Sequence, residues 1–116
     1  MAKISLKKNA VLGDPELQKG LKALHPDFGD FCIRVSGEPW GKPLIDQKTK
    51  TFIAIAVDIV EGITGKPFAN HINMARKQGV TRAELEELGL FMTIYAGFNK
   101  AGIYLAALNE VLGPRK

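Results

Sequence analysis

The sequence predicts an all-α protein, a single-domain bundle of five or six helices over about residues 14–113. Apolar residues recur at spacings of three and four along most of the chain, which is the periodicity of a helix with one buried face. Prolines and glycines stand between these segments, where helices begin and end. The longest apolar stretch, residues 52–60, continues a pattern too long for an average strand. A chain of 116 residues has room for one ordinary domain, which excludes separate cofactor and substrate lobes.

The first predicted helix begins at Asp14. Residues 1–13 are polar and poorly patterned, so we expect a poorly ordered N-terminal segment there. Asp14, Pro15 and Glu16 then supply an N-cap, a first-turn proline and a first-turn acid. A leucine stripe follows, and the helix is expected to end at residues 25–26, because a proline disfavours helical backbone in the residue before it.

A second apolar stripe follows, with Phe28, Phe31, Cys32 and Val35 at helical spacing. We expect it to stop near Gly37, since glycine readily adopts the left-handed conformation of a helix end. Residues 37–43 contain too much glycine and proline for a helix, which predicts a loop that carries Trp40, the only tryptophan. In such a loop this side chain is equally expected to wall a pocket or to fill a subunit contact.

The third predicted helix runs from about Asp46 to Glu61 and is apolar on nearly all sides over residues 52–57. Such a helix must be enclosed on several sides, which one small monomeric domain achieves with difficulty. The pattern therefore predicts an oligomer. Asp58 and Glu61 lie three residues apart, so their carboxylates can share a face, although solvated charges at a helix end are the simpler interpretation.

The C-terminal part is expected to form three more helical segments. Residues 62–65 break the pattern, and Pro67 then opens a helix that Gly79 closes. Thr81 and Glu84 have the spacing of a capping box, in which each side chain accepts from the other residue's amide. Residues 96–99 interrupt the helix that follows, and the last helix ends at residues 113–114.

Charge and cysteine content exclude several classes of function. The net charge of +4 favours anionic ligands, but the basic residues are spread along the chain, which argues against a nucleic-acid-binding face. A single cysteine, Cys32, cannot form an internal disulfide, a CxxC pair or a cysteine-rich zinc site. No segment has the length of a membrane span or the apolar core of a signal peptide, so we expect a soluble, cytoplasmic protein without membrane partners.

His71 is the first candidate for chemistry. It lies in the second turn after Pro67, flanked by polar side chains and by Ile72 of the apolar stripe. An imidazole there can donate or accept a proton near neutral pH. The alternative is a packed histidine satisfied by a backbone carbonyl. His25, before a proline at a helix exit, is expected to be structural.

Other residues are weaker candidates for a site. Tyr95 can direct its hydroxyl into a pocket, or be an ordinary core tyrosine. Lys42, Lys50 and Lys66 can supply positive charge to a carboxylate ligand, or be solvated surface lysines. Nucleotide-binding glycine motifs, HExxH and GxSxG are absent from the sequence, which removes the usual nucleotide, zinc-protease and serine-hydrolase interpretations.

Five segments in order carry a resemblance to a known family: Gly37–Trp40, Leu44–Lys50, His71–Ala75, Gly79–Glu84 and Ile94–Phe98. Together, over about residues 24–112, they resemble the carboxymuconolactone decarboxylase family, and most closely its γ-carboxymuconolactone decarboxylase branch. The resemblance implies the alkyl hydroperoxidase D-like helical fold and a ring-like homotrimer or homohexamer.

The second branch of that family resembles alkyl hydroperoxidase D and reduces peroxides with a CxxC pair and an upstream glutamate. Residues 63–67 occupy the region of that pair and contain no cysteine, so thiol peroxidase activity is not expected. Thr51 stands where the branch has its glutamate, and Asn73 where the decarboxylases often have an arginine.

The resemblance implies loss of carbon dioxide from a small carboxylated lactone or related unsaturated acid, with no metal or organic cofactor. His71 would be the proton donor or relay and Trp40 would wall the site, while Lys50, Asn73 and Tyr95 would orient the substrate. The alternative is a non-catalytic or repurposed ligand-binding oligomer of the same family.

Overall fold

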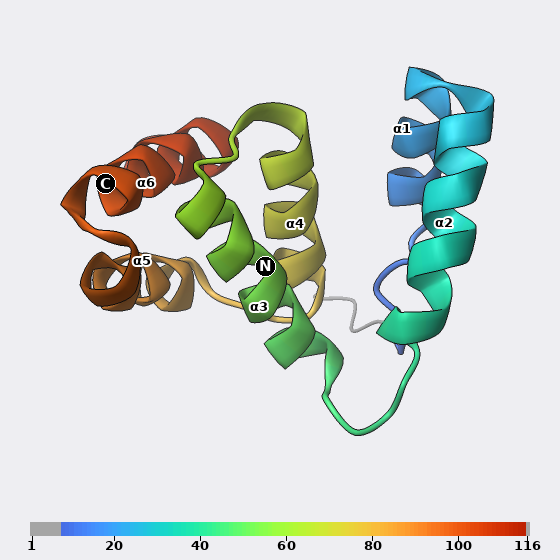
Figure 1. Ribbon diagram of the computed structural model, residues 1–116, viewed down its shortest axis with the longest axis horizontal. Coiled ribbons are helices and arrows are strands. Elements are labelled where there is room, and N and C mark those ends of the chain that lie inside the picture. The colour runs from blue at the N-terminus through green and yellow to red at the C-terminus, as the bar shows by residue number, and fades with distance from the viewer. Residues whose placement is uncertain (1–7, 116) are drawn as a thin grey trace.

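The computed structural model describes residues 8–115, which form six α-helices and no β-strand (Figure 1). The all-α prediction is confirmed. None of the helices in this range combines the length and the apolar character needed to cross a membrane. The helices are α1 (Pro15–Leu24), α2 (Pro26–Trp40), α3 (Gln47–Glu61), α4 (Gly65–Lys77), α5 (Arg82–Ala96) and α6 (Phe98–Leu112).

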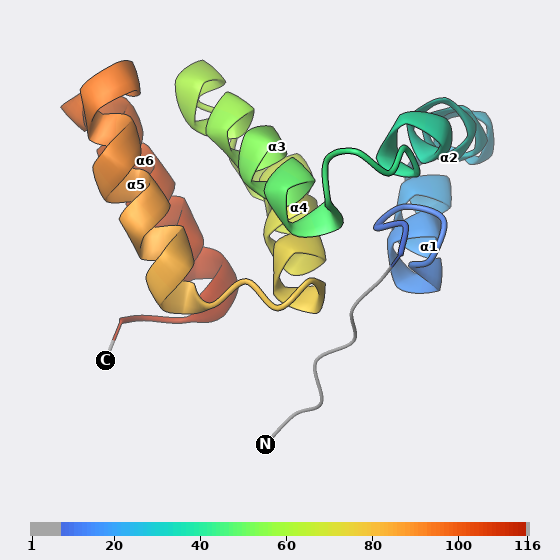
Figure 2. The same ribbon diagram turned by 90° about the horizontal axis from the view of Figure 1, so that it is seen from below.

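The helices are arranged as a hairpin beside a four-helix body (Figures 1 and 2). Helices α1 and α2 pack against each other and are joined by the single residue His25. Helices α3 and α4 lie next to the hairpin, and the pair α5 and α6 lies on their far side. We call α1 and α2 the hairpin and α3 to α6 the body.

The main core lies inside the body. Tyr104 of α6 is central, because its ring meets that of Phe68 edge-on at 5.7 Å and its hydroxyl donates to the carbonyl of Leu85 at 2.7 Å. Gly89 permits this packing, since a Cβ there would lie 2.9 Å from the Tyr104 ring. The buried apolar residues of this core are Ile55, Ile59, Phe68, Ile72, Ala75, Val80, Leu85, Met92, Tyr104, Ala107 and Leu108.

The segment before α1 contacts both the hairpin and the body. Residues 1–7 lie outside the described part of the chain, and residues 9–13 form a hydrogen-bonded turn. The Asn9 carboxamide oxygen accepts from the amides of Val11 and Leu12, and the Ala10 amide donates to Gln47 at 2.7 Å. Ala10 and Val11 are buried with Met74 of α4 in a second, smaller apolar cluster.

The expected loop over residues 37–43 is wrong at its start, because α2 continues through Pro39 to Trp40. Gly37 is a buried helical residue and not a terminator. Its role is close packing: a Cβ there would lie 2.7 Å from a methyl carbon of Leu12 in the preceding turn. The loop begins only after Trp40 and reaches α3 at Asp46.

The predicted helix starts at Asp46 and Thr81 are confirmed. The Asp46 carboxylate accepts from the Thr49 amide at 2.7 Å. Thr81 and Glu84 form the complete capping box, with hydrogen bonds of 2.9 and 3.1 Å. Lys48 of α3 lies 3.0 Å from the Glu84 carboxylate and so joins the start of α5 to α3.

Much apolar surface remains uncovered in the single chain. The helix expected to be enclosed, α3, has one open side, and α2 and α5 each expose a row of apolar side chains as well. We call these rows the exposed apolar stripes. They consist of Phe28, Phe31 and Val35 on α2, Ile53, Val57 and Val60 on α3, and Leu90, Phe91, Ile94 and Tyr95 on α5.

Candidate active site

His71 of α4 is paired with Asp58 of α3. Its ring nitrogen Nδ1 lies 2.5 Å from the carboxylate oxygen Oδ2 of Asp58. The turn between the two helices places both residues: Gly62 adopts a left-handed conformation with φ 68°, and the Ile63 amide donates back to the carbonyl of Asp58 at 2.9 Å. This helix end therefore fixes the residue that contacts the imidazole.

The two side chains differ in exposure. The Asp58 side chain is 4% exposed and that of His71 is 32% exposed. The carboxylate is therefore buried, whereas the imidazole is partly exposed to solvent. Burial raises the pKa of the Asp58 carboxyl, and the hydrogen bond to His71 offsets part of that rise. The second ring nitrogen, Nε2, has no hydrogen-bond partner among residues 8–115. The pair thus offers one imidazole nitrogen for proton transfer.

The interpretation of Asp58 as a solvated helix-end charge is wrong. Asp58 lies on the buried face of α3, together with Thr51, Ile55 and Ile59. The sequence contains a sign of this, because Asp58 falls three residues after Ile55 and next to Ile59. A carboxylate on an apolar face requires a partner, and His71 supplies it.

Trp40 and Lys50 lie together at the end of α2. The Lys50 ammonium donates to the carbonyls of Pro39, Trp40 and Lys42 at 3.2, 2.9 and 2.6 Å. A lysine has three N–H donors, so this contact uses all of them and caps the helix end. The Trp40 side chain packs against the cluster that contains Met74, which lies one helical turn beyond His71. Trp40 therefore lies where the end of the hairpin meets the body.

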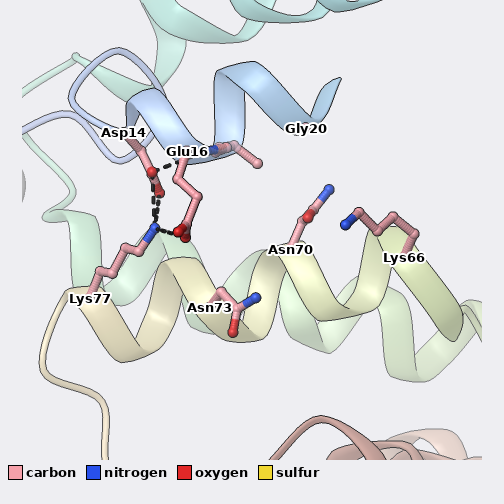
Figure 3. Close-up of a pocket in the computed structure, with 8 residues that line it drawn as sticks. Asp14, Glu16, Gly20, Lys66, Asn70, Asn73 and Lys77 are labelled. Carbon is pink, nitrogen blue, oxygen red and sulfur yellow. Dashed lines mark hydrogen bonds and ion pairs between the residues drawn. The ribbon is translucent and has the colours of Figure 1, made fainter. Parts of the chain in front are cut away.

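Asn73 and Tyr95 lie elsewhere in the single chain. Asn73 follows His71 by two residues, which places it on nearly the opposite face of α4. It lines a cleft of about 150 Å³ between α1 and α4, in which Lys66 and Lys77 also lie (Figure 3). Tyr95 is 71% exposed on α5, with its ring 5.4 Å from that of Phe91.

Thr51 and Cys32, the residues compared above with the peroxidase branch, do not belong to the Asp58–His71 pair. Thr51 is buried and donates its hydroxyl to the carbonyl of Lys48 at 2.7 Å. Cys32, the chain's one cysteine, lies on α2 and is partly buried. Within residues 8–115 no three His, Cys, Asp or Glu side chains are grouped to hold a metal ion.

The fold and the site define a small all-α protein in which the buried Asp58 carboxylate contacts the partly exposed imidazole of His71. Residues 26–110 match the model of the carboxymuconolactone decarboxylase family, and the chain belongs to that family. It is also 30% identical, over 108 residues, to 4-carboxymuconolactone decarboxylase of Acinetobacter baylyi, an alignment that covers 90% of this chain and 80% of the relative. The predicted family membership is confirmed.

Proposed function

We propose that the protein is a decarboxylase of a small carboxylated lactone or related unsaturated acid, acts without a bound cofactor, and uses His71 as its proton donor or relay. The observation that carries the proposal is the Asp58–His71 pair, in which a buried carboxylate holds one nitrogen of a partly exposed ring. Membership of the family and the name of the Acinetobacter baylyi relative support the reaction class.

The chemistry follows from what decarboxylation requires. The carbon–carbon bond to the carboxylate breaks, carbon dioxide leaves, and the electron pair spreads into the conjugated carbonyl system as an enolate. A proton must then reach carbon. It comes from Nε2 of His71, which carries a proton in the imidazolium form before the step and takes another from solvent after it. Trp40 is the proposed wall that keeps water from the developing charge.

The other residues proposed for the site are Lys50, which has a structural role, and Asn73 and Tyr95, which lie elsewhere in the single chain. Lys50 acts by holding the Trp40 segment in place, because its three donors are occupied by helix-end carbonyls. Asn73 lines the cleft between α1 and α4, and Tyr95 is exposed on α5, so we assign them a role only through a neighbouring subunit. The exposed apolar stripes support such an assembly, which we propose to be a homotrimer or homohexamer with the site at a subunit boundary.

A second candidate is a ligand-binding oligomer of the same family without turnover. Lys50 and Thr51 favour it, since neither has a polar group free for a carboxylate substrate. In that case the site would bind a small acid and leave it unchanged.

Purified protein tested on carboxymuconolactone and related lactone acids separates the candidates, with ultraviolet absorbance and released carbon dioxide followed together. Loss of absorbance with stoichiometric carbon dioxide is expected from the wild type and abolished in His71→Ala. His25→Asn is the matched control, because it removes the other imidazole and leaves a good helix cap. Binding without carbon dioxide release would support the ligand-binding candidate, and undiminished turnover by His71→Ala would overturn the role of His71.

A further inference from the structure

We propose that Asp58 is a positioning residue that holds the proton of neutral His71 on Nδ1, so that Nε2 is the nitrogen that exchanges protons with substrate. The second half of this statement rests on the proposed function, whereas the first half concerns the ring alone.

The geometry determines which tautomer the pair selects. An ionised carboxylate can only accept hydrogen bonds, and a neutral imidazole has one N–H and one lone pair. With Nδ1 2.5 Å from Oδ2 of Asp58, the proton of the neutral ring belongs on Nδ1, because a lone pair there would face an anion. The lone pair is then on Nε2, the other nitrogen of this partly exposed ring.

The surroundings of Asp58 hold this arrangement. Its backbone carbonyl accepts the Ile63 amide that closes α3, and its side chain is on the buried face between Ile55 and Ile59. Because the Asp58 side chain is only 4% exposed, losing its partner would leave a buried charge unpaired. The buried carboxylate therefore keeps its contact with Nδ1 of His71 and so fixes the orientation of the ring.

A fixed tautomer suits a proton relay. When Nε2 accepts a proton the ring becomes a cation beside the Asp58 carboxylate, and when it gives the proton up the ring returns to the same Nδ1–H form. The proton thus enters and leaves at one nitrogen. A ring free to change tautomer would present an N–H on Nε2 for part of the time and could not accept a proton there.

Nitrogen-15 NMR of the histidine ring tests the tautomer directly. In the His25→Asn background only one imidazole remains in the chain, so its two ring nitrogens are assigned without ambiguity. In alkaline buffer we expect a pyrrole-type Nδ1 and a pyridine-type Nε2. The opposite pattern in the otherwise unchanged protein would overturn the inference, and this measurement needs no further variant.

Variants then test whether Asp58 is the cause. Asp58→Leu replaces the acceptor by an apolar group of similar size and is expected to give a mixture of tautomers, while Asp58→Glu restores an acceptor and is expected to recover the Nδ1–H form. Glu61→Gln is the control, because it removes an exposed carboxylate one turn further along α3. An unchanged single tautomer in folded Asp58→Leu would also overturn the inference.

Turnover adds a second readout that distinguishes this inference from the proposed function. With a confirmed substrate, Asp58→Leu is expected to lower kcat roughly tenfold to a hundredfold with little change in KM, because the ring remains present and is only poorly held. If the Nδ1–H tautomer is observed but no substrate is turned over, the proposed function fails and the tautomer assignment stands. If turnover is observed with an Nε2–H ring, the inference fails and the function stands.

Discussion

Lys77 of α4 places its ammonium 2.9 Å from each carboxylate oxygen of Asp14, the residue that caps α1. The Asp14 side chain is almost fully buried by this contact. Because α1 belongs to the hairpin and α4 to the body, the ion pair links the two parts of the molecule. The same carboxylate also accepts from the Leu17 amide, so one side chain both starts a helix and docks it.

Asp14→Asn is expected to destabilise the protein by on the order of 2 kcal/mol, because it removes the charge from a buried ion pair while keeping a good helix cap. Urea unfolding at neutral pH measures the change. Glu16→Gln is the matched control: Glu16 contacts the same lysine at 3.1 Å but is 84% exposed, so its loss should cost less than about 0.5 kcal/mol. Equal losses in the two variants would contradict the assignment.

Gly29→Ala is expected to weaken the hairpin. A Cβ at Gly29 would lie 2.5 Å from the backbone nitrogen of Lys22 and 2.6 Å from its Cα, so the two helices would have to separate. Overpacking of this kind costs about 1–3 kcal/mol. Gly20→Ala is the control, because a Cβ there meets nothing within 4 Å and alanine favours the helix. Circular dichroism during thermal unfolding should show a lower Tm for the first variant only.

The capping box of α5 should weaken in acid. The hydrogen bond from the Thr81 amide, followed by that from Lys48, lowers the pKa of Glu84 below its ordinary value of 4.5. A carboxyl with a lowered pKa in the folded state stabilises the protein fully above its unfolded pKa, and this contribution is lost as the pH falls through the folded pKa.

Glu84→Gln tests this pH dependence. The variant should be less stable than the wild type at pH 7, and the gap between their urea midpoints should shrink as the pH falls below about 4.5. A gap that stayed constant from neutral to acid pH would show that the charge of Glu84 is not involved.

Ile94→Glu is expected to reduce the mass of the assembly. Ile94 lies in the exposed apolar stripe of α5, and a carboxylate buried at a subunit contact would be unpaired. Light scattering at micromolar concentration should show an oligomer for the wild type and a smaller species for the variant. Ala23→Glu adds the same charge on exposed α1 and should leave the mass unchanged. A monomeric wild type would refute the predicted oligomer.

Helix starts were predictable from the sequence because caps are local. Asp14, Asp46 and the Thr81–Glu84 pair each contact backbone within three residues, so their effect is visible in a short window. The predicted helix end at Gly37 is wrong for the opposite reason. Its glycine is required by Leu12, 25 residues earlier in the sequence, and composition alone cannot show that approach.

The site was predictable only in part. The residue type of His71 and its position on a helix indicate a candidate site, but its partner Asp58 is 13 residues away, and their contact depends on how α3 packs against α4. Lys50 was predicted as a free cation, and its three carbonyl partners come together only where α2 ends. Packing between distant parts of the chain therefore determines which charged side chains remain free to bind a ligand.

The position of the only tryptophan determines which part of the unfolding reaction intrinsic fluorescence detects. Trp40 ends the hairpin, and its indole packs against the small cluster with Ala10 and Met74, outside the main core of the body. Intrinsic fluorescence therefore follows the docking of the hairpin, while far-ultraviolet dichroism follows all six helices. If the hairpin detaches first, the two probes give different midpoints, and a separate fit of the fluorescence transition gives the free energy of that partial opening.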